Sequence, residues 1–87
     1  MKEQDLLDLD FQKVEVSEIQ AGGSPFYYYV YDFTPSFSLI TPANDDIEDD
    51  KWEVEIFENG EISFKEIEDL KLFIEIVERN MIQQLDF

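Results

Sequence analysis

The sequence predicts an α+β domain in which an antiparallel sheet of four to five strands carries one C-terminal helix packed on one face. Three observations predict this fold class. Segments in which apolar and polar residues alternate recur through residues 11–65, a run with helical periodicity follows them, and 44% of the residues are hydrophobic. Because 87 residues contain neither an internal repeat nor a low-complexity linker, we expect a single acidic domain, residues 1–87.

The clearest element is a β-hairpin over residues 51–65. In both of its halves, apolar side chains on one face alternate with glutamates on the other, which is the period of a half-buried strand. A three-residue loop over residues 58–60, with Gly60 in the left-handed conformation, keeps the apolar side chains on one face. The cross-strand pairs of this register are Ile56–Ile62, Val54–Phe64 and Glu53–Lys65.

Three further strands are expected before the hairpin, over residues 11–18, 25–33 and 37–41. The apolar phase slips between Phe11 and Val14, which indicates either a bulge near Gln12 or a short helical turn before it. The segment around Gly22 is the turn into the strand 25–33. That strand is apolar on both faces: one row is Phe26, Tyr28 and Val30, and the other is Tyr27, Tyr29, Tyr31 and Phe33.

The segment from Glu66 to Leu85 has the length and the periodicity of a helix. Acidic residues occupy its first turn and Arg79 lies near its end, as the helix dipole favours. Its main apolar stripe, with spacings of three and four residues, is Ile67, Leu70, Ile74, Val77 and Met81. Further apolar residues widen this stripe, so that the helix has more than one face to cover: Leu72, Phe73, Ile76 and Ile82.

Charge is the strongest signal about function. Twenty-two acidic residues against six basic ones give a net charge of −16, of which residues 44–87 carry −11. Such a chain repels phosphates, which excludes direct binding to nucleic acid or to an anionic membrane. A partner that is attracted by this charge is a basic protein.

The candidate partner-binding residues belong to an acidic loop and to the outer face of the hairpin, and we expect them to form one continuous negative surface with the acidic residues of the helix. They are Asp45, Asp46, Glu48, Asp49, Asp50, Glu53, Glu55 and Glu61. The aromatic row Tyr27, Tyr29 and Tyr31 is either the second face of the core or an exposed contact patch, because Tyr is favoured at protein interfaces. If the row is exposed, it provides an aromatic anchor surrounded by acid.

The composition gives little support to catalysis. The chain has neither Cys nor His, so that thiolate nucleophiles, thiolate metal sites and hydrolytic triads are absent, and we expect no enzyme. The acidic loop lacks the glycine and the distal glutamate of a helix–loop–helix calcium site, and we expect neither a metal nor a cofactor. Without a signal peptide or an apolar span, the expected location is the cytoplasm, or the host cytoplasm if the protein is viral.

These observations favour an inhibitor of the DNA-mimic type, which occupies the basic surface of a nuclease or of another nucleic-acid-binding protein. In composition and size the chain is similar to the acidic inhibitors that phages use against host restriction and CRISPR systems, although no motif carries this resemblance. Two alternatives remain open. One is an immunity or regulatory partner of a basic toxin or enzyme. The other is a homo-oligomeric structural protein, such as a homodimer that buries the Tyr row in a symmetric interface.

Overall fold

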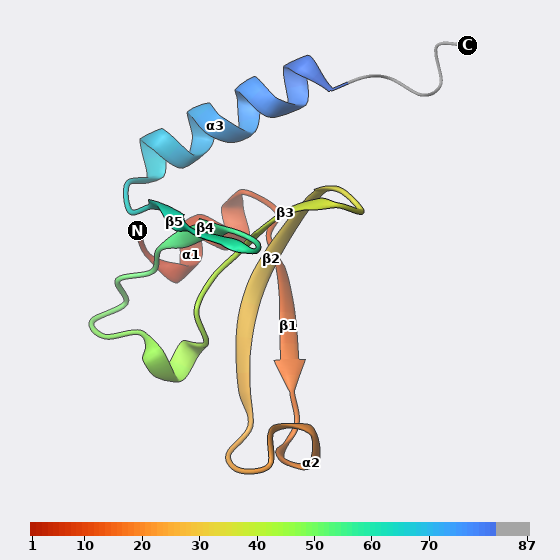
Figure 1. The fold of residues 1–87 in the computed structure, drawn as a ribbon. Coiled ribbons are helices and arrows are strands. Elements are labelled where there is room, and N and C mark those ends of the chain that lie inside the picture. Colours follow the sequence, from red (N-terminus) through yellow and green to blue (C-terminus); the bar gives the residue numbers. More distant parts are fainter. Residues whose placement is uncertain (82–87) are drawn as a thin grey trace.

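The computed structural model describes residues 1–81, apart from the side chain of Ala21, and confirms the α+β class. Five antiparallel strands form one sheet in which each strand pairs with its neighbours in sequence, in the order β1-β2-β3-β4-β5 (Figure 1). The strands are β1 (Gln12–Val16), β2 (Phe26–Thr34), β3 (Phe37–Ile40), β4 (Val54–Ile56) and β5 (Asn59–Phe64). The helical elements are α1 (Glu3–Asp8), α2 (Glu18–Ala21), the 3-10 turn η1 (Asn44–Asp46) and α3 (Ile67–Asn80).

The slip in apolar phase near the N-terminus is caused by a short helix, α1. Of the two explanations that the sequence left open, the helical turn is confirmed and the bulge near Gln12 is not needed. α1 buries Leu6 completely, and the chain then turns through Asp10, which has a positive φ of 68°. Phe11 follows as a buried residue that packs its ring against Tyr31, with centroids 5.2 Å apart. β1 starts after this turn, so that its side chains take a new phase.

The turn between β1 and β2 contains a helix that the pattern does not predict. Ser17 caps α2 and its hydroxyl accepts a hydrogen bond from the backbone N–H of Gln20, while the side chain of Gln20 accepts one from the backbone N–H of Ser17. Gly22 ends the helix in the left-handed conformation with φ 71°, which glycine adopts without strain. α2 lies at the tip of a two-stranded arm that β1 and the first part of β2 form (Figure 1).

The hairpin β4–β5 has the expected face but a different turn. Val54 pairs with Phe64 as predicted, whereas Ile56 pairs with Asn59 and not with Ile62. The turn has two residues, and its left-handed residue is Glu58, with φ 67°, instead of Gly60. The irregularity therefore lies within β5, which leaves Ile62 with 45% of its surface exposed. β5 ends at Phe64, so that the expected pair Glu53–Lys65 does not form part of the sheet.

The core lies on the face of the sheet that carries the Tyr row, and both α1 and α3 pack on it. Its buried apolar residues are Leu6, Phe11, Tyr29, Phe33, Leu39, Trp52, Val54, Leu70 and Ile74. α3 attaches through Phe73, whose ring lies 4.8 Å from that of Phe64 and 6.1 Å from that of Phe33 between centroids. Large side chains thus meet across a thin layer, as expected of a small domain.

The predicted stripe of α3 is confirmed, because Leu70 and Ile74 are buried and Ile67, Val77 and Met81 are half-buried. The additional stripe is only partly covered: Phe73 packs in the core, but Leu72 and Ile76 remain 55% and 41% exposed. The helix ends at Asn80, earlier than expected, since Met81 has an extended backbone. The other predicted helical residues, 82–85, lie outside the described part of the chain.

The opposite face of the sheet has no helix over it among residues 1–81. The register places Val14 and Val16 of β1 beside Tyr28 and Phe26 of β2, and Val30 beside Ile40 of β3. All six side chains are half-buried, and we refer to them as the open face. Two rows of apolar side chains in β2 therefore have different environments, and the row with three tyrosines is the inner one.

Candidate protein-binding surface

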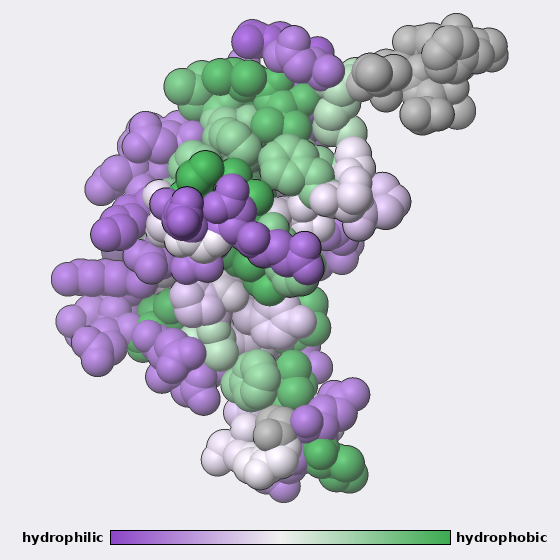
Figure 2. All heavy atoms as spheres, viewed as in Figure 1, coloured by the Kyte–Doolittle hydropathy of each residue, from purple (hydrophilic) through white to green (hydrophobic). Residues whose placement is uncertain are grey.

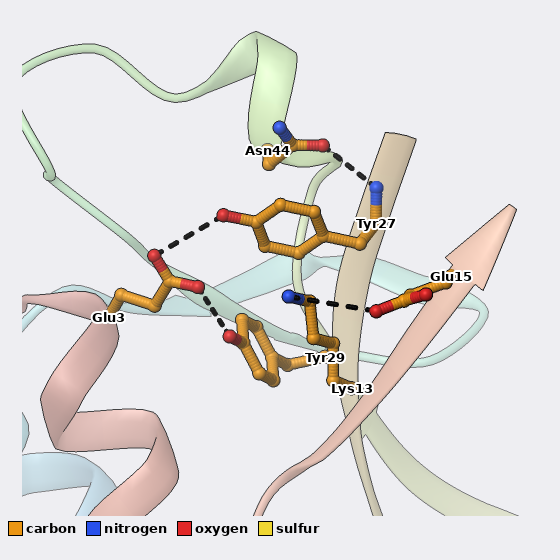
Figure 3. A network of polar contacts seen from close by, with 6 residues as sticks. All are labelled: Glu3, Lys13, Glu15, Tyr27, Tyr29 and Asn44. Atoms are coloured by element: carbon orange, nitrogen blue, oxygen red, sulfur yellow. Dashed lines mark hydrogen bonds and ion pairs between the residues drawn. The ribbon is translucent and has the colours of Figure 1, made fainter. Parts of the chain in front are cut away.

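The acidic loop between β3 and β4 is fastened to the body of the protein at three positions. At its start, the side-chain oxygen of Asn44 accepts a hydrogen bond of 2.8 Å from the backbone N–H of Tyr27 (Figure 3). In its middle, Ile47 packs against the core. At its end, one oxygen of Asp50 accepts two hydrogen bonds, from the backbone N–H of Glu3 at 3.1 Å and from the indole N–H of Trp52 at 3.0 Å.

These attachments divide the predicted carboxylates of the loop into two groups. Asp50 is structural, since it joins the start of α1 to a buried Trp. All five side chains are exposed, and the four without such attachments are Asp45, Asp46, Glu48 and Asp49. Because Asn44, Ile47 and Asp50 hold the backbone between them, these four carboxylates have a fixed base from which they extend into solvent. We call the four residues the acidic segment.

The glutamates of the hairpin are less exposed than the acidic segment. Glu61 is exposed, whereas Glu53 and Glu55 are half-buried. Glu55 pairs with Ser63 on the side of the sheet opposite the core, and a carboxylate oxygen of Glu55 lies 3.4 Å from the position that a Cβ on Gly60 would occupy. The three glutamates and the acidic segment therefore lie on consecutive parts of the chain, the hairpin β4–β5 and the loop before it. Hydrophilic residues cover the side of the molecule on which this loop lies (Figure 2).

The Tyr row is not an exposed contact patch, which corrects one of the two expectations for it. Tyr29 is 1% exposed, and Tyr27 and Tyr31 are half-buried against the core. Trp52 stacks on Tyr27, with ring centroids 6.2 Å apart, and meets Tyr29 edge-on at 5.4 Å. The row is inner because α1, α3 and the Trp all pack on its side of β2.

The three hydroxyl groups of the row bind carboxylates. Tyr29 and Tyr27 both donate to Glu3, from the two sides of one carboxylate, and Tyr31 donates to Glu78 of α3 (Figure 3 shows the pair at Glu3). The pKa of Tyr27 and that of Tyr29 are both raised above the ordinary value. Burial is the larger cause and the hydrogen bond to Glu3 is the second. Burial and the bond to Glu78 raise the pKa of Tyr31 to about 12. The three tyrosines therefore stabilise the fold, because they join β2 to α1 and α3.

Little of the negative charge is compensated within the chain. Among residues 1–81, which contain all six basic residues, the only ion pair joins Lys13 and Glu15 of β1, at 3.8 Å. The expected partner of the hairpin glutamates, Lys65, makes no ion pair in this part of the chain. The negative field of the protein therefore extends into solvent.

Between Met1 and Met81, no group of three Asp or Glu side chains converges closely enough to hold a metal ion. Within the same range, no helix has the length and apolarity that crossing a membrane requires. A comparison with protein-family models, curated proteins and solved structures finds no match to this chain.

Proposed function

We propose that this protein is an acidic inhibitor that occupies the basic, nucleic-acid-binding surface of a target protein, in the manner of a DNA mimic. The observation that supports the proposal is the acidic segment: four exposed carboxylates on a loop that Asn44, Ile47 and Asp50 fasten to the core. A row of fixed negative groups presents a charge density comparable to that of a nucleic-acid strand, which carries about one charge per 3.4 Å along each strand.

The fixed backbone of the loop matters for affinity. A flexible acidic tail loses conformational entropy when it binds, whereas a loop that is already ordered loses less. The charge also accelerates the encounter, since a field of one sign steers an oppositely charged partner. Both effects act without cofactor chemistry, and the segment requires only a basic groove opposite it.

The test is a charge reversal that respects the structural role of Asp50. The variant Asp45→Lys, Asp46→Lys, Asp49→Lys changes three exposed side chains and keeps the carboxylate that binds Trp52. A matched control, Glu18→Lys, Glu68→Lys, Glu75→Lys, changes the net charge by the same amount at exposed positions elsewhere. Both variants are compared with the wild type in pull-downs from bacterial lysate and then in binding to the recovered protein, with thermal melting as the test of folding.

We expect the segment variant to lose the partner and the control to keep most of the affinity, with an on-rate that falls steeply as ionic strength rises. Added duplex DNA should displace the wild-type protein from its target. Equal losses in both variants would show that only net charge matters. Binding that duplex DNA does not affect would favour the alternative, a regulatory or immunity partner of a basic protein that uses the same field without imitating DNA.

A further inference from the structure

One edge of the sheet, formed by β1, carries a second surface that the proposed function does not require. β1 is the first strand of the sheet, and only β2 pairs with it. Among residues 1–81, the backbone of residues 12–16 makes no hydrogen bond outside this pairing. An edge strand of this kind offers a row of unpaired N–H and C=O groups to another strand.

The charges on this strand suit a copy of itself. Lys13 and Glu15 lie on one face of β1, two residues apart, with side chains that are 41% and 77% exposed. If two β1 strands pair antiparallel about a two-fold axis at Val14, Lys13 of each copy lies opposite Glu15 of the other. Directly opposed side chains of an antiparallel pair have Cβ atoms about 5 Å apart, close enough for both ion pairs to form.

A lysine alone on an edge strand discourages pairing, because it would meet another lysine or would be buried. Glu15 makes pairing favourable in one register only, the one centred on Val14, because each Lys13 then lies opposite a Glu15 of the other copy. The same axis places the Val14 side chains of the two copies against each other on the open face. The pattern Lys-Val-Glu is therefore complementary to itself.

The charge of the surrounding region also permits a second copy to approach. Residues 11–43 contain one Lys and three acidic residues, a net charge of −2 out of −16 for the whole chain. A second copy that approaches the acidic loop would meet strong repulsion, whereas one that approaches β1 meets little. Exposed charges further away are screened over about 8 Å at physiological ionic strength.

We propose that two copies of this protein associate through antiparallel pairing of their β1 strands about a two-fold axis at Val14, with reciprocal Lys13–Glu15 ion pairs. The two five-stranded sheets become one continuous sheet of two copies. Both acidic segments remain outside this interface, because they lie on the connection between β3 and β4. Self-association and binding of a basic partner therefore use different surfaces.

The experiment is analytical ultracentrifugation over a range of concentrations, with three charge variants. Lys13→Glu and Glu15→Lys each place like charges opposite one another in the symmetric pair, so that each variant alone should be monomeric. Mixing these two variants restores both ion pairs in a heterodimer, and the double variant Lys13→Glu, Glu15→Lys restores them in a homodimer. The wild type should approach twice the chain mass of 10.3 kDa at high concentration.

Melting temperatures provide the control for folding, since both side chains are exposed and their pair in one chain contributes little. A wild type that stays monomeric at every concentration would overturn the proposal. A dimer that the single variants do not weaken, or one that the mixture and the double variant fail to restore, would do the same. Reversal of the acidic segment should leave the dimer intact, so that the dimer and the proposed inhibitor function are tested separately.

Discussion

The arm formed by β1 and the first part of β2 differs from the rest of the protein in the way it uses its side chains. Around the arm, residues 11–43 carry a net charge of −2 and include the apolar open face, which has no helix over it among residues 1–81. Residues 44–81 carry fourteen acidic and four basic residues, and they supply the acidic segment, the hairpin glutamates and α3. Residues 11–43 are therefore nearly neutral and residues 44–81 are strongly acidic, although the acidic part also carries four large exposed apolar side chains: Phe57, Ile62, Leu72 and Ile76.

The net charge of −16 is therefore not spread evenly along the chain. A uniform coat would oppose every association of the protein with itself, and it would surround the open face as densely as any other surface. The uneven charge fits the two proposals made above, in which a basic partner binds the acidic segment and a second copy pairs with β1. The two halves meet at Trp52, where the acidic loop packs on the Tyr row.

The largest effect is expected at this junction. Trp52 is 3% exposed, stacks on Tyr27 and donates its indole N–H to Asp50, so that Trp52→Ala removes the packing that joins the loop to the arm. We expect a loss of about 3–5 kcal/mol in the free energy of unfolding, as for other buried Trp residues. Urea denaturation measures it. Phe57→Ala, at a position that is 52% exposed, is the matched control and should cost far less; equal losses would place Trp52 outside the core.

Within the acidic loop, a smaller effect should separate Asp50, which accepts two hydrogen bonds, from the carboxylates of the acidic segment. Asp50→Ala leaves two donors, the backbone N–H of Glu3 and the indole of Trp52, without their acceptor, and we expect a loss of about 1–3 kcal/mol. Asp46→Ala changes an exposed side chain of the same type and should stay within about 0.5 kcal/mol of the wild type. If both variants melted alike, Asp50 would belong with the acidic segment.

Alkaline pH should weaken the inner tyrosine row. The pKa of Tyr31 is raised from 10.0 to about 12 by burial and by its bond to Glu78, so the folded state favours the protonated phenol. Its contribution to stability is therefore complete below the unfolded pKa, about 10, and is lost as the pH rises through about 12. Tyr31→Phe should reduce the slope of stability against pH in this window, as followed by denaturation and by absorbance of the phenolate. An unchanged slope would show that Tyr31 ionises normally.

The sequence predicts the strands and helices well where one period dominates. The alternation in residues 51–65 and the spacing of Leu70 and Ile74 required only a count of apolar positions, and both elements are present. The predicted hairpin turn was wrong, because the left-handed residue is Glu58 and not Gly60, and because the pairing of β5 is irregular. α2 was missed because its four residues are too few to show a period, although Ser17 and Gln20 form a recognisable capping box.

The candidate site was predictable only in part. The sequence identified the acidic loop, but it could not distinguish Asp50 from its neighbours, since the distinction depends on contacts with residues 47 positions away in the chain and on the indole of Trp52. For β2, both rows are equally apolar in the sequence. What decides between them is the packing of α1, α3 and Trp52 on one side of β2. The two helices come from opposite ends of the chain, and they also supply Glu3 and Glu78 to the tyrosine hydroxyls.

The smallest predicted effect concerns the backbone of the acidic half. Glu58 occupies the left-handed region with φ 67°, where a side chain with a Cβ costs about 1–2 kcal/mol relative to glycine. Glu58→Gly relieves this strain, but glycine also loses more entropy on folding. We therefore expect a net gain of at most about 1 kcal/mol, measured as a rise in the urea midpoint.

Glu61→Gly is the control for this change, because it removes the same charge from β5, where the residue has no positive φ. Glycine inside a strand is unfavourable, so this variant should lose about 0.5–1 kcal/mol. Opposite signs for the two variants would attribute the effect to the backbone at Glu58. Equal gains in both would mean that charge repulsion within the acidic half dominates, and salt would then reduce both gains because it screens exposed charges. The two variants together therefore separate the free energy of backbone strain at Glu58 from that of charge repulsion within residues 44–81.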